Sequence, residues 1–417
     1  MNIVVVNTSY LGSGCEKLAR QVCERLIRRG HRVTELVGVA QGNGAEWVCP
    51  IPYLPLEKKA QTAFAIVTGL NDLLLPTCYT LPWREPIKSA DVVHLFNMHG
   101  SYFALPVIGT LAKRKPVVWT MVDMWAFTGT CAYSKECTRF IAGCYDCPSI
   151  KRREYPSLTH DWTRLFWNLK RRWYGNSTII LNPTTRWLEG LVRQSILKNL
   201  AVRQIWYGID PVEFYPMDRK AVRYALGMPT DDECVVVGLF HTFLLDPRKG
   251  IVSLLEAIAS RPEATDPRFI YFIMGQDSEQ IATRFGHRLR ICAKNLVRCD
   301  DELNHALNAL DILLYPTQAE NLSLTTLDAM AAGVTVISTN VGGMSEAITD
   351  GENGFLVELG DNAAMVDALL DAAANPARRR QIGENARATI LRQFHIDRYV
   401  GEIERVYAEA IARKGGK

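Results

Sequence analysis

Arg248 and Lys249 are the two residues of this sequence best suited to binding phosphate groups. They stand side by side in the segment HTFLLDPRKGI (241–251), directly after the apolar run CVVVGLF (234–240). An arginine can bind phosphate oxygens through two parallel hydrogen bonds, and a lysine adds a point charge, a pairing that suits a diphosphate. A solvated basic turn is the alternative. Because the pair follows a strand-like run, we predict a phosphate site here.

The segment AENLSLTTLDAMAAG (319–333) predicts a short helix whose start can bind an anion. Ser323 or Thr325 can cap the first turn, and the final glycine can end the helix. The first backbone N–H groups of a helix lack partners within it and carry partial positive charge. The amides at Leu322, Ser323 and Leu324 are therefore predicted to contribute to the same phosphate site.

Two carboxylates flank that helix start and could contact other parts of a ligand. Glu320 lies in the loop before the helix, and Asp328 lies inside it. Aspartate is a poor helix former, by roughly 0.5 kcal/mol relative to alanine, so its presence there invites a functional explanation. A short carboxylate beside a binding site can accept two hydrogen bonds from a vicinal diol such as that of ribose. The alternative for Asp328 is a solvent-facing helix residue.

Two sets of alternating strands and helices surround these residues. The sequence breaks between the sets near IWYGIDPVEFYP (205–216), which glycine and proline punctuate. The strand-like apolar runs lie at 3–7, 31–37, 91–96 and 115–122, and then at 234–240, 269–275, 310–316 and 334–339. This pattern predicts an α/β fold with two doubly wound parallel-sheet domains; a single large α/β domain is the alternative. Ligands bind at the carboxyl ends of strands in such sheets, so we expect a site in a cleft between the domains.

Taken together, these residues resemble the group 1 family of retaining, nucleotide-sugar-dependent glycosyltransferases, which have the GT-B fold. The segment 319–333 is similar to the signature of that family, in which two acidic residues are separated by seven others and followed by A-M-A-x-G. VISTNVGGMSEAITDGENGFLV (336–357) and the DPRKG and IWYGIDPVEFYP segments extend the resemblance across nearly the whole chain. Within the family, DVVHLFNMHGSYF (91–103) and the cysteine-containing stretch at 117–148 are most similar to exopolysaccharide and capsule enzymes.

The resemblance implies roles for the residues around the predicted phosphate site. Arg248 and Lys249 match the pair that binds the donor diphosphate. Glu320 matches the first family glutamate, near the transferred sugar, and Asp328 matches the second, which holds the ribose hydroxyls. The sequence departs from the family here, because aspartate is one methylene shorter than the usual glutamate. This departure weakens the ribose contact, brings the helix closer, or marks an inactive relative.

Further positions carry over from the family in the same way. The segment Leu322, Ser323 and Leu324 matches backbone amides that contact donor sugar and phosphate. His99 fits the histidine of the N-terminal domain that contacts the donor sugar, with a structural histidine as the alternative. Gly14, in the loop YLGSGCEK, falls near the diphosphate; the residues alone allow an ordinary structural turn there equally well.

The resemblance implies a domain organisation and an activity. The predicted parts are a Rossmann-like, acceptor-side domain at 1–205, a nucleotide-sugar-binding domain at 206–390, and a C-terminal helix at 391–417 that packs back across both. The predicted reaction moves a sugar, with retained configuration, to a hydroxyl of a glycan or lipid-linked saccharide in polysaccharide biosynthesis. No Asp-x-Asp pair is present, which fits a metal-independent enzyme without a required cofactor. A catalytically inactive GT-B binding or activating protein and a nucleotide-sugar epimerase are the competing hypotheses.

Four cysteines cluster between 131 and 147 and leave three states open. Cys131, Cys137, Cys144 and Cys147 could bind a structural Zn²⁺ as four thiolates, remain as packed thiols, or form two disulfides. Only the last pair has the spacing of a zinc knuckle. Disulfides are disfavoured in a reducing compartment.

The overall charge is small, whereas one stretch is strongly basic. The 417 residues carry a net charge of +4, with 48% apolar and 22% charged residues, as in an ordinary soluble protein, and a nucleic-acid partner is not expected. Residues 151–174 hold seven basic and two acidic side chains among several aromatic ones. This segment is either a solvated basic helix or a peripheral contact with an anionic membrane. MNIVVVNTSY lacks the features of a signal peptide, so we expect a cytoplasmic protein, with the inner face of the membrane as its place of peripheral contact.

Overall fold

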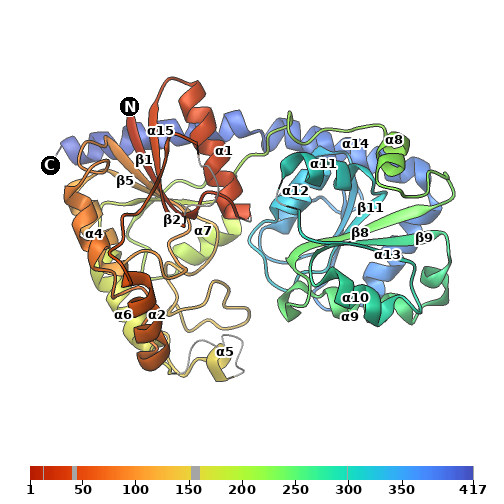
Figure 1. Cartoon of the computed structure of the whole chain (residues 1–417), viewed down its shortest axis with the longest axis horizontal. Coiled ribbons are helices and arrows are strands. Elements are labelled where there is room, and N and C mark those ends of the chain that lie inside the picture. Colours follow the sequence, from red (N-terminus) through yellow and green to blue (C-terminus); the bar gives the residue numbers. More distant parts are fainter. Residues whose placement is uncertain (13, 40–44, 152–159, 298, 417) are drawn as a thin grey trace. The chain divides into compact units, whose positions relative to one another are not determined.

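The chain folds into two compact units, as seen in a computed structural model that describes residues 1–12, 14–39, 45–151, 160–297 and 299–416 (Figure 1). Unit 1 comprises Met1–Tyr207 and Asp397–Lys417, and unit 2 comprises Gly208–Ile396. The chain thus leaves unit 1 just before Gly208, in the glycine- and proline-punctuated segment, and returns to it at the end.

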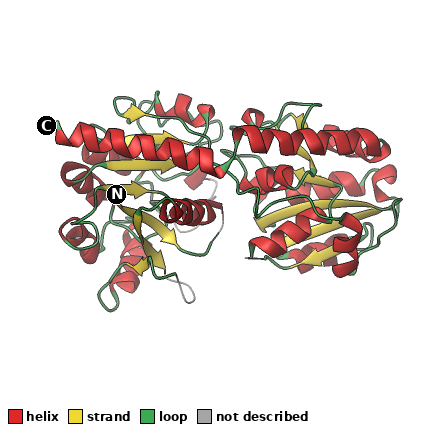
Figure 2. Cartoon of the chain, turned by 90° about the horizontal axis from the view of Figure 1, so that it is seen from above, coloured by secondary structure: helices red, strands yellow, loops and turns green. Residues whose placement is uncertain are grey.

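Unit 1 is built on a seven-stranded parallel sheet with the strand order β3-β2-β1-β4-β5-β6-β7. The strands are β1 Asn2–Ser9, β2 Arg32–Val39, β3 Val48–Pro50, β4 Val92–Leu95, β5 Val117–Met121, β6 Ile180–Pro183 and β7 Ala201–Val202. The central strands are buried on both faces because helices cover the sheet on both sides (Figure 2).

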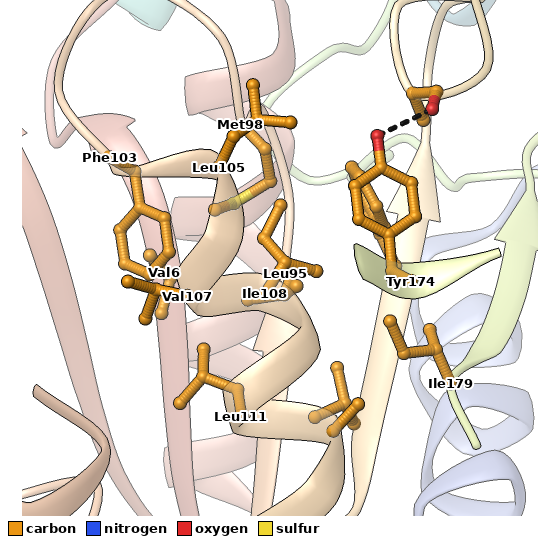
Figure 3. Packing of buried hydrophobic residues seen from close by; sticks show 14 of the residues in the cluster. Val6, Leu95, Met98, Phe103, Leu105, Val107, Ile108, Leu111, Tyr174 and Ile179 are labelled. Atoms are coloured by element: carbon orange, nitrogen blue, oxygen red, sulfur yellow. Dashed lines mark hydrogen bonds between the residues drawn. The ribbon is translucent and has the colours of Figure 1, made fainter. Parts of the chain in front are cut away.

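The helices of unit 1 differ in length and in how they are positioned. They are α1 Gly14–Arg28, α2 Glu57–Thr68, α3 Pro76–Thr80, α4 Leu105–Arg114, α5 Pro148–Lys151, α6 Thr163–Tyr174, α7 Arg186–Val192 and α15 Ile396–Gly415, with a 3₁₀ turn at Leu81–Trp83. Leu105, Ile108 and Leu111 of α4 pack on the sheet beside Leu95 of β4 (Figure 3). Tyr174 of α6 joins this core, and its hydroxyl donates to the Ala126 carbonyl oxygen at 2.7 Å.

The C-terminal helix α15 is part of unit 1 from Asp397 onward. The Tyr407 hydroxyl lies 2.6 Å from His94 Nδ1, and Glu404 pairs with Arg29 at 2.7 Å. His94 is fully buried in β4, where burial lowers its pKa to about 3. It is a core histidine.

Unit 2 is built on a six-stranded parallel sheet with the order β10-β9-β8-β11-β12-β13. The strands are β8 Val235–Phe243, β9 Phe269–Gln276, β10 Ile291–Lys294, β11 Ile312–Tyr315, β12 Thr335–Thr339 and β13 Phe355–Val357. The helices are α8 Arg219–Ala225, α9 Ile251–Ala259, α10 Ser278–Phe285, α11 Asp300–Asn308, α12 Leu324–Ala331, α13 Asn362–Ala374 and α14 Pro376–Gln393. Three 3₁₀ turns lie at Pro247–Lys249, Pro262–Thr265 and Met344–Glu346.

The two parallel sheets confirm the α/β prediction of two doubly wound domains. Each predicted apolar run overlaps a strand, and the predicted C-terminal segment contains α15 from Ile396. Its expected passage across both domains stays a prediction. In the part of the chain that the structure describes, no helix combines the length and apolar character that a bilayer crossing requires.

Candidate functional site

The turn that carries Arg248 and Lys249 lies beyond the carboxyl end of β8. Asp246 caps it, with the Arg248 amide donating to the Asp246 carboxylate at 2.9 Å. Gly250 then has a φ of +68°, and a Cβ there would lie 2.1 Å from the Pro316 carbonyl oxygen. Only glycine fits this position, so the turn and the loop after β11 are held in close contact.

Lys249 and Glu320 form a buried ion pair between those two loops. Lys249 Nζ donates to Glu320 Oε2 at 3.0 Å, and the side chains are only 5% and 13% exposed. The Tyr315 hydroxyl, at the end of β11, donates to the same carboxylate oxygen at 3.3 Å. The predicted cation and the predicted loop glutamate are thus in direct contact, with Arg248 as the neighbour of Lys249.

The cations keep Glu320 ionised despite its burial. Burial alone raises the pKa of this carboxyl group, but the charges of Lys249 and Arg248 outweigh that effect and lower the pKa to about 2. Burial lowers the pKa of Lys249, and Glu320 partly offsets this. Beside them, burial and both cations lower the pKa of His241 to about 3, so this imidazole is neutral near pH 7.

The pH dependence of stability follows from the lowered pKa of Glu320. A carboxyl group with a lower pKa in the folded state stabilises the protein above the unfolded pKa of 4.5, and the stabilisation is lost as pH falls toward 2. We expect unit 2 to lose stability between about pH 5 and pH 3, and Glu320→Gln to flatten that loss. Far-UV circular dichroism melts across this range measure it; identical slopes for both proteins would contradict it.

The helix that follows Glu320 begins at the predicted residues. Ser323 is the N-cap of α12, and its hydroxyl oxygen accepts a hydrogen bond from the Thr326 amide at 3.1 Å. Ser323 and not Thr325 therefore caps the helix. Leu322 is buried and Leu324 partly so. The helix start places amides beside the ion pair, where partial positive charge favours an anion.

A second glycine fixes the loop that carries Glu320. Gly342 has a φ of +61°, and a Cβ there would lie 1.7 Å from the Glu320 carbonyl oxygen. The next amide, of Gly343, donates to the Asn321 carbonyl oxygen at 2.6 Å. The glycine pair after β12 thus supports the loop before α12.

Asp328 is buried inside unit 2. Its side chain is 2% exposed in the middle of α12. The alternative of a solvent-facing residue is therefore wrong, because the turn of the helix that carries Asp328 packs inward. Its predicted contact with ribose hydroxyls stays a prediction.

In unit 1, the two predicted residues follow neighbouring strands of the sheet. Gly14 begins α1 after β1, and His99 lies in the loop after β4. His99 Nε2 lies 3.0 Å from Asp123 Oδ2, and Asp123 follows β5. Burial lowers the pKa of His99, but Asp123 outweighs it and raises the pKa above its ordinary value. His99 is thus a candidate cation whose role in the reaction stays a prediction.

A cavity of about 360 Å³ opens beside His99 within unit 1. Trp125 lines it together with Asp72, Thr130 and Lys170. One carboxylate oxygen of Asp72 and the Thr130 hydroxyl are buried without a hydrogen-bond partner among the described residues. Burial raises the pKa of Asp72 to about 6 and lowers that of Lys170 to about 7. The cavity offers an aromatic surface and polar groups able to bind hydroxyls.

Sequence reasoning missed several of these residues. Tyr315 is the next-to-last residue of the apolar run at 310–316, and Asp123 directly follows the run at 115–122. The rule that ligands bind at strand ends could therefore have found both. Asp72 lies far from a predicted strand, and Lys170 lies on a helix with surface-like composition. No local signal marks either.

The four clustered cysteines line one small cavity of about 20 Å³. All four are free thiols, and within the described residues no three His, Cys, Asp or Glu side chains are arranged to hold a metal ion. Burial raises the pKa of Cys131 to about 12 and that of Cys144 to about 11, which favours protonated thiols unless a cation binds. The structural zinc therefore stays a prediction.

Metal analysis of the purified chain separates the three cysteine states. The zinc prediction expects about one Zn²⁺ per chain, lost in the Cys144→Ser/Cys147→Ser variant. Absence of zinc, with four more reactive thiols in the unfolded wild type than in a variant lacking all four, would establish packed thiols. Four fewer thiols than the sequence holds, recovered on reduction, would establish two disulfides.

The structure describes Lys151 and residues 160–174 of the basic stretch, and helix α6 makes up most of this part. Lys170 is fully buried, and its ammonium group donates to the Thr128 carbonyl oxygen at 3.1 Å. It therefore cannot serve the predicted membrane contact. Phe166 and Trp167 are buried, whereas Trp162 is exposed. Positions 152–159 lie outside the described residues.

Comparison with known proteins supports the assignment of unit 2. The family described as "Glycosyl transferases group 1" matches residues 244–389, so the predicted resemblance is confirmed for this part of the chain. D-inositol 3-phosphate glycosyltransferase 2 of Catenulispora acidiphila is 32% identical over 191 residues, 43% of this chain and 44% of that protein. The chain spans about half or less of the length of the curated relatives it matches, from 31% to 51%. A special closeness to exopolysaccharide or capsule enzymes stays a prediction.

Solved structures confirm the GT-B fold. Sucrose-phosphate synthase of Thermosynechococcus elongatus has a TM-score of 0.70 at 18% identity, covering 99% of both chains. HepE of Anabaena, in complex with UDP-glucose, has a TM-score of 0.68 at 18% identity, covering 98% of this chain and 100% of HepE. At these identities the likeness concerns the fold.

Proposed function

We propose that this chain, with its match to group 1 glycosyl transferases over residues 244–389, moves a sugar from a nucleotide-diphosphate sugar to a hydroxyl group. The proposed acceptor is a glycan or lipid-linked saccharide of polysaccharide biosynthesis. One observation carries the proposal: the buried Lys249–Glu320 pair adjoins Arg248, on loops that follow β8 and β11. The two cations suit the diphosphate of such a donor, and the ionised carboxylate beside them suits the hydroxyl groups of its sugar.

The proposed step breaks the bond between the sugar C1 and the diphosphate oxygen. A bond forms between C1 and the acceptor oxygen on the same face, and the acceptor proton passes to the leaving diphosphate. Arg248, Lys249 and the amides at the start of α12 stabilise the negative charge that develops on that diphosphate. These groups supply the positive charge for the leaving group, so we propose a metal-independent reaction.

Glu320 is proposed to hold the transferred sugar. With a pKa of about 2 it carries no proton near pH 7 and cannot act as a general acid. An ionised carboxylate accepts hydrogen bonds from sugar hydroxyls. The buried carboxylate of Asp328 is proposed to hold ribose hydroxyls. The two carboxylates thus serve two parts of the donor.

The cavity beside His99 in unit 1 is proposed to receive the acceptor saccharide. Its volume of about 360 Å³ is ample for a sugar ring. Trp125 offers an aromatic face for the apolar side of such a ring, while Asp72 and Thr130 can bind its hydroxyls. His99 is proposed to contact the donor sugar.

We also propose a peripheral contact with anionic membrane through the exposed part of 151–174. Arg164, Arg171 and Arg172 are exposed on α6, and Trp162, just before the helix, is exposed as well. Each basic residue near an anionic surface contributes about 1 kcal/mol of attraction. Vesicles rich in phosphatidylserine should retain the wild type more strongly than an Arg164→Gln/Arg171→Gln/Arg172→Gln variant. Retention of the wild type on neutral vesicles that equals its retention on phosphatidylserine-rich vesicles would contradict the contact.

Incubation of the full chain with a panel of nucleotide-diphosphate sugars tests the proposed function. The uridine nucleotides come first, because the solved relative HepE binds UDP-glucose. A transferase hydrolyses one donor slowly and consumes it faster with acceptor, without loss of activity in a chelator. Conversion to an isomeric nucleotide sugar without acceptor would establish an epimerase. No consumption of any donor, despite binding, would establish an inactive binding protein.

A further inference from the structure

A second hollow of about 190 Å³ lies in unit 2, at the opposite edge of the sheet from the donor site. Asp311 and Thr335, which line it, stand at the amino-terminal ends of β11 and β12. The donor site occupies the carboxyl ends of strands in the same sheet. Helix α12 begins at the donor site, and Gly333, just after its end, lines this hollow.

The hollow is lined by an excess of positive charge. The carboxylate of Asp311, almost fully buried, accepts hydrogen bonds from three guanidinium groups, those of Arg219 at 2.9 Å, Arg379 at 3.2 Å and Arg223. One carboxylate can neutralise only one of these three cations. The charge at the base of the hollow is therefore positive.

Two more arginines raise this excess. Arg380 and Arg387 also line the hollow, and among the described residues Glu384 is its only acidic lining residue besides Asp311. Arg387 donates to the carbonyl oxygens of Ala331 and Phe214. Within the described residues Arg380 makes neither a hydrogen bond nor an ion pair. Four arginines, Arg219, Arg379, Arg380 and Arg387, thus line the hollow together with two carboxylates. Arg223 adds a fifth guanidinium group through its contact with Asp311.

The arginines retain capacity to bind a ligand. Arg219 Nε is buried without a hydrogen-bond partner among the described residues, although the side chain as a whole is 36% exposed. Burial lowers the pKa of Arg219 and of Arg379, and repulsion from the neighbouring arginines adds to this in both. An arginine cluster that served only to bury Asp311 would not need the surplus cations at the mouth of the hollow.

We propose that this hollow binds a small phosphate-bearing anion, at a site separate from the donor site. Guanidinium groups bind phosphate oxygens through paired hydrogen bonds, and Arg219 and Arg380 present theirs at the accessible side. An anion would neutralise the positive charge of the arginines that the Asp311 carboxylate leaves uncompensated. A volume of about 190 Å³ suits a phosphate or diphosphate group with a small organic part.

Binding of inorganic pyrophosphate to the full chain, measured by titration calorimetry at constant ionic strength, tests the proposal. Because the donor site also binds a diphosphate, the Arg248→Gln variant provides the background in which the second site is observed. We expect one remaining site in that variant. Adding Arg219→Met and Arg380→Gln should weaken it at least tenfold. The matched control adds Arg268→Gln and Arg284→Gln, which remove two exposed cations elsewhere in unit 2.

Three results would overturn the proposal: no pyrophosphate bound to Arg248→Gln, unchanged affinity in the Arg219→Met/Arg380→Gln variant, or equal weakening in the control. Weakened binding to phosphatidic acid vesicles, without weakened pyrophosphate binding, would also reject it and indicate a lipid-facing basic surface. If the proposed donor site is wrong, the result is different: the wild type and the Arg248→Gln variant would then bind pyrophosphate equally. The two proposals can therefore fail independently.

Discussion

Replacing Arg248 by alanine is expected to lower kcat/KM for nucleotide-sugar consumption by about 100-fold to 1,000-fold. Its guanidinium group lies in the turn after β8, next to Lys249, whose ammonium group binds Glu320. A preorganised hydrogen-bond donor of the protein acts most strongly on charge that develops in the transition state. We therefore expect kcat to fall along with kcat/KM. Steady-state kinetics with the donor found in the panel measures the effect.

The structure offers a matched control for this variant. Arg284 on α10 is exposed and pairs with Glu256, so Arg284→Ala removes the same charge from the same unit at a distance from the two loops. Its kcat/KM should remain within about twofold of the wild type. Unchanged turnover in Arg248→Ala, with the donor consumed normally, would refute the diphosphate site.

Replacing Lys249 by methionine is expected to destabilise unit 2 by about 3–5 kcal/mol. The change leaves the Glu320 carboxylate buried without its principal cation, and a buried charge that loses its partner is strongly unfavourable. The double variant Lys249→Met/Glu320→Gln removes both charges and should recover a large part of the loss. Denaturant titration of the wild type, Lys249→Met, Glu320→Gln and the double variant measures the coupling between the two side chains.

The distribution of tryptophan makes this measurement specific for unit 2. All nine tryptophans precede residue 208, so their fluorescence reports on unit 1, whereas far-UV circular dichroism reports on both units. Lys249→Met should lower the denaturant midpoint of unit 2. This change should appear in the dichroism transition and not in the fluorescence transition. Additive effects of the two single substitutions, or an equal shift of the fluorescence transition, would contradict the role of the pair.

The positions of the long strands along the chain could be predicted from the sequence because apolar runs mark buried parallel strands. β8, β9, β11 and β12 coincide with such runs. The short outer strands were not predicted. β7 has two residues and β13 has three, so neither shows a period, and both are formed through pairing with a neighbouring strand.

The donor-site residues were predictable to the extent that they lie at strand ends. The positions of Arg248, Lys249 and Glu320 follow from the order of strands and loops, but their direct contact depends on the approach at Gly250, which only the folded chain shows. The burial of Asp328 depends equally on which face of α12 packs inward.

The cavity of unit 1 and the arginine-lined hollow of unit 2 had no signal in the sequence. Lys170 belongs to a basic run, yet it is buried because α6 turns that position toward Trp125, with the ammonium group 3.8 Å from the ring centroid. Arg219, Asp311 and Arg379 are far apart along the chain and meet only through the packing of unit 2. Composition cannot reveal such convergence.

The most direct test of the central claim compares nucleoside diphosphates with the corresponding monophosphates. Dissociation constants for the uridine, guanosine, adenosine and thymidine pairs are measured with the full chain and with Arg248→Ala. We expect one diphosphate to bind the wild type at least tenfold more tightly than its monophosphate, and Arg248→Ala to remove most of this difference. An equal preference for the diphosphate in both proteins, or no preference in the wild type, would contradict the claim that the turn after β8 binds the donor diphosphate.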